Sequence, residues 1–135
     1  MVSGMALRIH VDVVSAERLI FTGQAEQLHI RGEVGELGIF PRHTPLLTSI
    51  RPGLLRLILS EKRQQTFFVS SGYLEVQPHI VTVLADTVIR SEELDLAAAN
   101  AAREIEQYKG KKMQFDKEFA LNVALIRALS ELKKT

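Results

Sequence analysis

Apolar and polar residues alternate along much of the first ninety residues of the chain. Between Leu7 and Val13 every second residue is aliphatic, which is the period-two pattern of a strand with one buried face. Turn signals such as Pro52-Gly53 and Ser71-Gly72 separate these apolar segments, and no helical pattern lies between them. We therefore predict an antiparallel β-sandwich or barrel over residues 5–88. Its strands are expected at 7–13, 18–22, 28–30, 46–50, 54–59, 66–70, 73–76, 80–84 and 87–89.

The period changes to that of a helix after Arg90. Acidic and capping residues at 91–95 precede a run of alanines, and Gly110 is expected to end the helix. Asp116 is expected to cap a second helix. We predict an antiparallel helical hairpin over residues 91–135, whose apolar face has to be covered by the sandwich or by a partner. The residues assigned to that face are Leu94, Ala98, Ala101, Ala102, Ile105 and Tyr108, then Phe119, Val123, Ile126 and Leu129, widened by Leu121, Leu125 and Leu132.

Residues 32–45 interrupt the alternating pattern with three glycines at every third position and with Pro41 and Pro45. Glycine and proline disfavour both a helix and a regular ladder, so we interpret the segment as an ordered loop that presents Glu36 and Arg42. The glycine spacing faintly suggests a phosphate-binding loop. That interpretation fails because neither a Lys-Ser or Lys-Thr pair nor a helix follows the glycines.

Composition limits the chemistry that the chain can perform. It has 135 residues, a formal net charge of +1 and no cysteine. These values argue against nucleic-acid binding, thiol chemistry and cysteine-ligated metals. The histidines lack the short spacing of a metal site, no catalytic constellation can be assigned, and no cofactor is expected. With no apolar run near ~20 residues and no secretory signal, we expect a soluble cytosolic protein that binds partners rather than catalyses.

The segments between residues 12 and 86 resemble a known family along nearly the whole predicted sandwich. The chain resembles the ε subunit of F-type ATP synthase, which is called δ in mitochondria. The helical part matches less, mainly at Leu94-Asp95 and in length. The matching segments are DVVSAE at 12–17, FTG at 21–23, GELGIFP at 35–41, His43, PLLT at 45–48, IRPG at 50–53, GYLEVQP at 72–78 and VTVLAD at 81–86.

The resemblance implies a β-sandwich of about ten short strands in two sheets, followed by a helical hairpin. In the family the sandwich binds the γ subunit and the ring of c subunits as part of the rotating central stalk. Glu36 would be the acidic c-ring contact, flanked by Gly35, Leu37 and Gly38, and Arg42 and His43 are expected to contact γ or shape the loop. Such a subunit has no catalytic residues and lies on the cytoplasmic face of the inner (plasma) membrane without inserting into it.

The resemblance also implies a regulatory role for the C-terminal helices. In many bacterial members they permit turnover when folded against the sandwich, and they inhibit ATP hydrolysis when they extend toward the catalytic α and β subunits. Some relatives bind ATP at the start of the first helix, where an arginine pairs with phosphate. Here Leu94 and Asp95 remain but Ala98 stands in the place of that arginine, so we expect no ATP binding. Arg42 also departs from the family, since many relatives have glycine there.

The favoured hypothesis is therefore a rotor subunit that couples proton translocation to ATP synthesis. The alternative is a free-standing β-sandwich that binds a ligand or a peptide. Such a sandwich would carry clustered aromatics on one face, whereas this chain has no tryptophan and only Tyr73 and Tyr108 as tyrosines. An enzyme ranks third.

Overall fold

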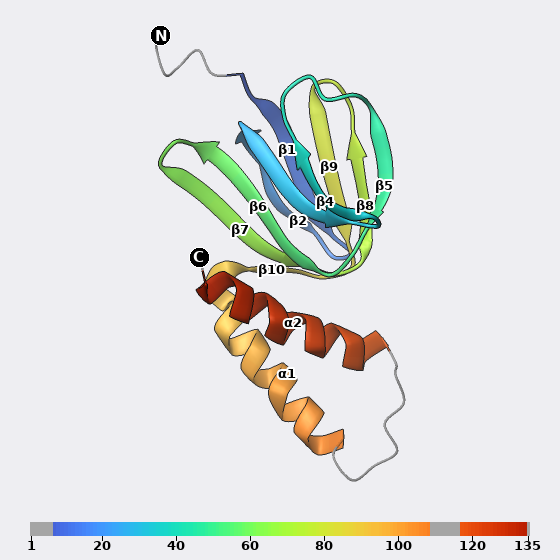
Figure 1. The fold of residues 1–135 in the computed structure, drawn as a ribbon, viewed down its shortest axis with the longest axis vertical. Helices are drawn as coiled ribbons and strands as arrows, with labels where there is room; N and C mark the ends of the chain where they lie inside the picture. Colours follow the sequence, from blue (N-terminus) through green and yellow to red (C-terminus); the bar gives the residue numbers. More distant parts are fainter. Residues whose placement is uncertain (1–6, 109–116, 135) are drawn as a thin grey trace.

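A computed structural model describes residues 7–108 and 117–134 of the chain. Within these residues the predicted fold class is confirmed: a ten-stranded sandwich is followed by two helices (Figure 1). The strands are β1 (Ile9–Ser15), β2 (Leu19–Ala25), β3 (Gln27–Gly32), β4 (Gly35–Ile39), β5 (Leu46–Ile50), β6 (Gly53–Ser60), β7 (Arg63–Val69), β8 (Gly72–Val76), β9 (Ile80–Ala85) and β10 (Val88–Arg90). The short 3-10 turn η2 (Ser91–Glu93) leads into α1 (Leu94–Tyr108), and α2 (Lys117–Lys133) follows.

The ten strands form one continuous hydrogen-bonded sheet that folds over on itself. Its order is β10-β7-β6-β3-β5-β8-β9-β1-β2, with β4 paired to β3 beside this path. A single residue pair, Gly32 with Ile50, joins the two halves through β3 and β5. On the opposite side the Phe21 and Phe67 rings meet edge to face, and Arg90 Nη2 donates a hydrogen bond of 2.8 Å to the carbonyl of Ile20. These contacts bring the two free ends of the sheet together, so the sandwich is nearly a closed barrel.

One strand pair corrects the prediction of a wholly antiparallel sandwich. β1 runs parallel to β9, in a register from His10 opposite Ile80 to Ser15 opposite Ala85. The alternating pattern shows that both segments are strands, but direction is fixed only where a short hairpin joins two neighbours. β1 and β9 are far apart in sequence, so nothing local in either segment indicates their relative direction.

The core lies between the two halves of the folded sheet. It is formed by the apolar residues that alternate with polar ones along the strands. In β1 the side chains of Val11 and Val13 are completely buried, while His10 and Asp12, which alternate with them, are half-buried on the outer face. The core also contains Leu55, Leu57, Phe67, Leu74, Val81 and Val83, all fully buried. Such a core lowers the free energy of folding roughly in proportion to the apolar area it removes from water.

The second correction concerns residues 35–39, which were predicted to be loop. They form β4, which pairs with β3 from Gly32 opposite Gly35 to Leu28 opposite Ile39. Gly35 has a φ of 140°, a conformation that glycine adopts readily, and β4 lies beside the main strand order. Glycines are tolerated where a strand borders only one neighbour, and Ile39 still supplies a buried anchor, so this glycine-rich segment is an edge strand.

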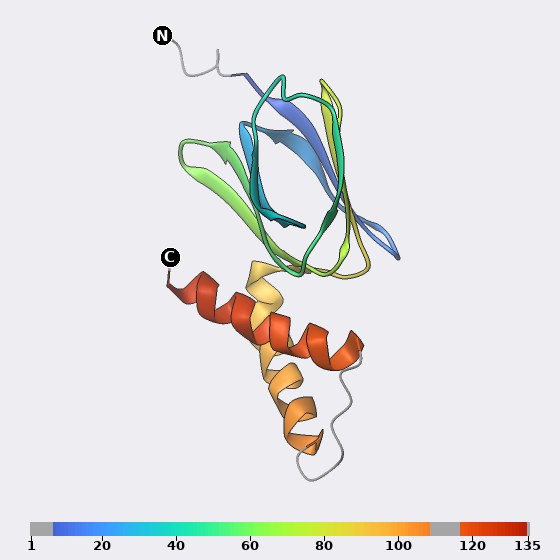
Figure 2. The same cartoon turned by 45° about the vertical axis from the view of Figure 1, so that its right-hand side comes forward.

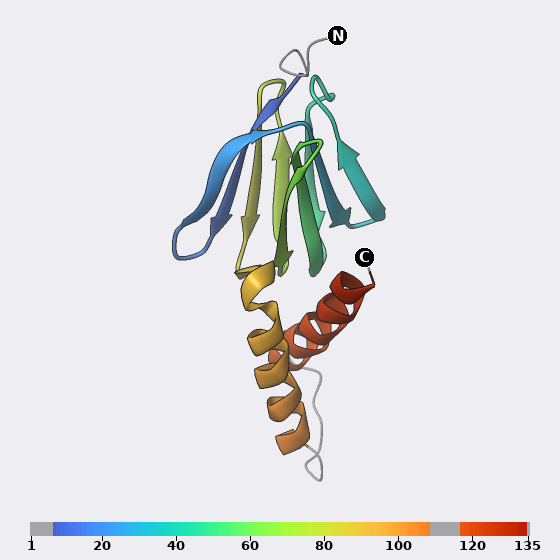
Figure 3. The same cartoon turned by 90° about the vertical axis from the view of Figure 1, so that its left-hand side faces the viewer.

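The helical hairpin packs against the outside of the sandwich rather than into its core. Figures 2 and 3 show α1 leading away from the strands while α2 crosses beneath them. A second apolar cluster holds the two together; its buried members are Leu54 and Phe68 of the sheet with Leu94, Ala101, Leu125 and Ala128 of the helices. Among the described residues, neither helix is long and apolar enough to cross a membrane.

The predicted helical face needs one correction and one addition. Ala102 is exposed, because the buried side of α1 follows Leu94, Ala98 and Ala101. On α2 the buried side includes Asn122, which donates a hydrogen bond of 2.7 Å from Nδ2 to Glu104 Oε2 of α1. The predicted roles of Gly110 and Asp116, and of the side chains of Tyr108 and Phe119, lie outside what the structure describes.

Candidate partner-binding surfaces

The β3–β4 hairpin presents the acidic residue singled out in the sequence. Glu36 lies exposed on β4, opposite Arg31 of β3. Gly35 and Gly38 are exposed on the same strand, while Leu37 is half-buried and packs against the sandwich core. Val34 at the hairpin tip is 97% exposed. The hairpin is thus an ordered projection with a carboxylate on one strand and an apolar tip.

Glu33 anchors this hairpin to the other half of the sheet, a feature that the sequence did not reveal. Ser49 Oγ donates a hydrogen bond of 2.8 Å to Glu33 Oε2, and Arg51 Nη2 lies 3.4 Å from Glu33 Oε1. The Ser49 hydroxyl, and after it the positive charge of Arg51, lower the pKa of the Glu33 carboxyl below its ordinary value. The charged form of Glu33 therefore holds the hairpin turn against β5.

Arg42 and His43 lie in the turn between β4 and β5. Arg42 has a φ of 65°, in the left-handed region that favours glycine. The backbone N–H of His43 donates to the carbonyl of Phe40 at 3.1 Å, and His43 Nδ1 lies 2.7 Å from the carbonyl oxygen of Thr44. The turn therefore keeps a glycine-like conformation although arginine occupies the position. Both side chains are available at the surface, Arg42 more than His43.

Sequence analysis missed an apolar surface on the outside of β5, β8 and β9. Leu47 is 68% exposed, Tyr73 58% and Leu84 48%, and these three residues form what we call the outer apolar patch. Together with Glu75 and Thr82 they line a shallow cavity of about 380 Å³. The signal in the sequence was that these residues stand at strand positions where the alternating pattern calls for polar side chains.

A second cavity continues from the outer apolar patch. It measures about 550 Å³, shares Tyr73 and Leu84 with the first, and includes the carboxylates of Glu33 and Asp86. The combined surface joins the outer apolar patch with three acidic residues, Glu33, Glu75 and Asp86. Large exposed apolar surface bordered by polar groups is typical of protein–protein contact sites.

The remnant of the family's ATP motif is split between two sides of α1. Leu94 and Ala98 are buried. Asp95 points outward, and its Oδ1 lies 3.8 Å from Lys133 Nζ near the end of α2. Asp95 therefore forms an exposed ion pair between the two helices, and Ala98 is an uncharged residue of the buried side.

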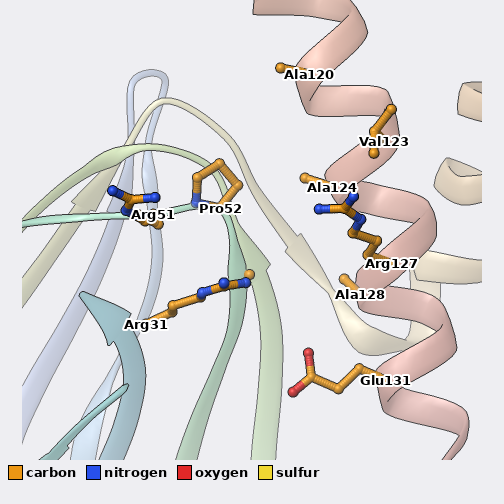
Figure 4. Close-up of a pocket in the computed structure, with 10 residues that line it drawn as sticks. Arg31, Arg51, Pro52, Ala120, Val123, Ala124, Arg127, Ala128 and Glu131 are labelled. Carbon is orange, nitrogen blue, oxygen red and sulfur yellow. The ribbon is translucent and has the colours of Figure 1, made fainter. Parts of the chain in front are cut away.

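A third cavity, of about 350 Å³, lies between α2 and the β5–β6 turn (Figure 4). Arginines approach it from both sides: Arg31 and Arg51 from the sandwich and Arg127 from α2. Glu131 also lines it, one helical turn beyond Arg127. The other lining residues of α2 are small and apolar, namely Ala120, Val123, Ala124 and Ala128. This cavity therefore combines three arginines and one glutamate with small apolar side chains.

Two observations on the described residues concern metal ligands and titratable side chains. No three His, Asp or Glu side chains gather there in a way that would hold a metal ion. On the strands, the side chains of His10, Asp12 and Thr22 form a hydrogen-bonded polar cluster. Thr22 Oγ1 donates to Asp12 Oδ1 at 2.7 Å and lowers the pKa of Asp12, with a smaller contribution from His10, whose Nε2 lies 2.8 Å from the same oxygen. This cluster joins β1 and β2 on the surface and borders none of the three cavities.

The sequence matches one protein family over the whole sandwich. The family model for the ATP synthase Delta/Epsilon chain, beta-sandwich domain, covers residues 8–91. The ATP synthase epsilon chain of Verminephrobacter eiseniae is 50% identical over 133 residues, spanning 93% of this chain and 96% of that protein. The epsilon chain of Nitrosococcus oceani is 46% identical over 137 residues, spanning 96% of this chain and 98% of that protein.

Solved structures agree on the fold. A chain in the cryo-EM structure of the Euglena gracilis mitochondrial ATP synthase OSCP/F1/c-ring superimposes with a TM-score of 0.71 at 18% identity, covering 94% of this chain and 80% of that one. A chain of the Tetrahymena thermophila mitochondrial ATP synthase central stalk/c-ring gives a TM-score of 0.62 at 12% identity, covering 93% and 96%. Because the family model covers the sandwich and the two relatives match over nearly their whole length, the chain belongs to the family of ATP synthase epsilon chains.

Proposed function

We propose that the chain is a non-catalytic rotor subunit of an F-type ATP synthase, in which its sandwich binds γ and the c-ring and couples proton translocation to ATP synthesis. The observation that carries this proposal is the pair of separate contact surfaces on one rigid sandwich. The outer apolar patch lies on β5, β8 and β9, and the Glu36 hairpin belongs to the other half of the sheet. A protein that joins two partners needs two such surfaces.

The outer apolar patch is proposed as the γ-binding surface. Leu47, Tyr73 and Leu84 together expose apolar side chains in a region where a strand's outer face is normally polar. Burial of such residues at a contact lowers the free energy of association, and tyrosine is enriched in protein interfaces. The acidic residues beside the patch predict a partner that presents basic groups around an apolar centre.

The β3–β4 hairpin is proposed as the c-ring contact, with Glu36 as its acidic group and Gly35, Leu37 and Gly38 around it. Anchoring through Glu33 supports this role, because a hairpin that is already ordered loses little conformational entropy on docking. Arg42 and His43, in the turn after β4, are proposed to contact γ or to shape this end of the sandwich.

The helices are proposed to regulate the enzyme. Folded against the sandwich, as here, they would permit turnover, and extended along γ toward the α and β subunits they would inhibit ATP hydrolysis. Their modest interface with the sandwich supports this proposal, since little area has to be exchanged between two arrangements. The chain would work at the cytoplasmic face of the inner (plasma) membrane, peripherally. Family membership favours this proposal over a free-standing ligand-binding sandwich.

Co-purification with the cognate γ subunit tests the γ-binding proposal. The full chain should be retained by γ, and Tyr73→Glu in the outer apolar patch should weaken binding at least about tenfold, the usual scale for an anchor residue. Leu96→Glu is the matched control, because Leu96 is 67% exposed on α1 and lies outside the patch. If the unaltered chain failed to bind γ, the proposed γ-binding function would be refuted. If both variants lost the same affinity for γ, the outer apolar patch would not be the binding surface.

The c-ring contact has its own test in coupled ATP synthesis. Glu36→Lys should lower proton-driven ATP synthesis in a reconstituted complex while leaving the fold intact, because the side chain is exposed. Glu61→Lys serves as the control, since Glu61 is an exposed carboxylate in the β6–β7 turn. Normal coupling with Glu36→Lys would rule out this role for Glu36.

A further inference from the structure

The turn between β4 and β5 places an arginine where a turn of its type calls for glycine. The backbone N–H of His43 donates to the carbonyl of Phe40 at 3.1 Å, which closes a four-residue turn. Pro41 occupies its second position and Arg42 its third, with a φ of 65°. Proline keeps φ negative at the second position, so the positive φ at the third makes this a type II turn, whose third residue is usually glycine.

Arg42 strains the backbone without a contact that offsets the strain. Within the described residues it is the one non-glycine residue with a positive φ. Such a conformation brings Cβ too close to the following carbonyl oxygen, which is unfavourable for residues other than glycine. The side chain is exposed, and the described part of the chain contains no hydrogen bond, ion pair or ring contact of its guanidinium. This combination points to a contact that is made in the assembled complex.

Exposed apolar side chains precede and follow the turn. Phe40 is 48% exposed, and its ring meets the ring of His29 edge to face. Leu47 of the outer apolar patch is 68% exposed and follows Arg42 by five residues, so their Cα atoms lie within roughly 18 Å of each other. Arginine and large apolar side chains are enriched among the residues that dominate the binding energy of protein interfaces.

The charge of Arg42 is opposite to that of the residues beside the outer apolar patch. The carboxylates that line its cavities, Glu33, Glu75 and Asp86, call for basic groups on a partner. Arg42 calls for an acidic group, because a guanidinium can pair with a carboxylate through two parallel N–H···O bonds. Opposite charges at separate places on one contact surface favour one orientation of the partner over the reverse.

We propose that Arg42 is a γ-binding residue, whose guanidinium pairs with a carboxylate of γ beside the outer apolar patch and so fixes how γ is oriented on the sandwich. This inference rests on the proposed function and deepens it. The contact belongs to the Arg42 side chain, while the backbone of His43 closes the turn. The isolated chain then contains the strain of the turn, and the complex gains the ion pair.

Arg42→Gly separates the two effects, because it relieves the backbone and removes the guanidinium. In urea denaturation of the isolated full-length chain this variant should be at least as stable as the unaltered chain, with an unfolding equilibrium constant up to about fivefold lower. Its affinity for purified γ should fall about tenfold, the scale of an interface anchor. Arg42→Ala should lose the same affinity without the gain in stability, since it keeps the strain.

Two further variants separate the charge of Arg42 from other effects. Arg42→Lys keeps the positive charge and should recover part of the affinity for γ, because lysine lacks the paired geometry of the guanidinium. Arg63→Ala is the control, since it removes an exposed arginine from the start of β7 and should change neither stability nor binding. Added salt should weaken γ binding of the unaltered chain more than that of Arg42→Ala.

The outcomes distinguish this inference from the proposed function. If the unaltered chain binds γ but Arg42→Gly and Arg42→Ala bind it equally well, the inference is overturned and the γ-binding function stands. A loss of both stability and binding in Arg42→Gly would overturn it too, because Arg42 would then be a structural residue of the turn. If the unaltered chain failed to bind γ, the γ-binding function would be refuted and this inference with it.

Discussion

The sandwich and the helical hairpin are held together by different means. The sandwich encloses a core of fully buried Leu, Val and Phe side chains within a continuous ladder. The hairpin rests on Leu54 and Phe68 through alanines, Leu94 and Leu125, supported by polar contacts such as Asn122–Glu104 and Lys133–Asp95. From this difference we expect the sandwich to act as a rigid frame and the hairpin to separate from it without unfolding it.

The largest effect is expected in the sandwich core. Phe67 is fully buried and contacts the ring of Phe21, so Phe67→Ala should lower the free energy of unfolding by about 3–5 kcal/mol. Because the core is shared by both halves of the sheet, the whole sandwich should lose stability together. Urea denaturation followed by a β-sheet signal measures this loss. A change of less than about 1 kcal/mol would contradict a cooperative core.

Truncating Leu125 should separate the two regions. It is 6% exposed in the cluster between α2 and the sandwich, so Leu125→Ala should weaken that contact by about 2–3 kcal/mol. We expect faster hydrogen exchange in α2 with little change in β1 and β9. If the strands were destabilised equally, the helices would be part of one cooperative unit and the contrast would fail.

The partly buried hydrogen bond between the helices should have a smaller effect. Asn122→Ala leaves Glu104 without its partner and should reduce helix pairing by about 1–2 kcal/mol. Ser130→Ala on the exposed side of α2 is the control. Helical content and α2 exchange provide the measurement, and equal behaviour of the two variants would show that the bond contributes nothing.

The smallest predicted effect is a pH dependence of the sandwich. The Thr22 hydroxyl depresses the pKa of Asp12 below its ordinary value of 3.8. A carboxyl with a depressed folded-state pKa adds stability above its unfolded pKa and loses it as pH falls through the folded value. Thr22→Val should therefore lower the urea midpoint slightly at pH 6, and the difference should shrink below pH 3.8. A difference that grows on acidification would have the wrong sign.

The sequence predicts most of the sandwich, because apolar residues at every second position, such as Val11 and Val13, show which side of a strand is buried. The relative direction of β1 and β9 is not recorded locally, since it depends on pairing over a long separation. The edge strand β4 was missed because glycines weaken the strand pattern at a position where only one neighbour constrains it.

Candidate surfaces were predictable to different degrees. Glu36 stood out because its glycine-rich setting is distinctive, and it does lie exposed on an ordered hairpin. The outer apolar patch becomes evident only when Leu47, Tyr73 and Leu84 are brought side by side from three strands. The Glu33–Ser49 and Asn122–Glu104 hydrogen bonds join residues 16 or more positions apart, so no pattern along the chain contains them.

The most direct measurement compares the full chain with a chain lacking residues 91–135 in an ATP synthase depleted of its own epsilon chain. The account predicts that both versions bind the complex and restore proton-coupled ATP synthesis, because the proposed contacts to γ and the c-ring all lie on the sandwich. It predicts that only the full chain inhibits ATP hydrolysis. If the chain without residues 91–135 failed to bind although its sandwich was folded, the proposed division of work between the two regions would be contradicted.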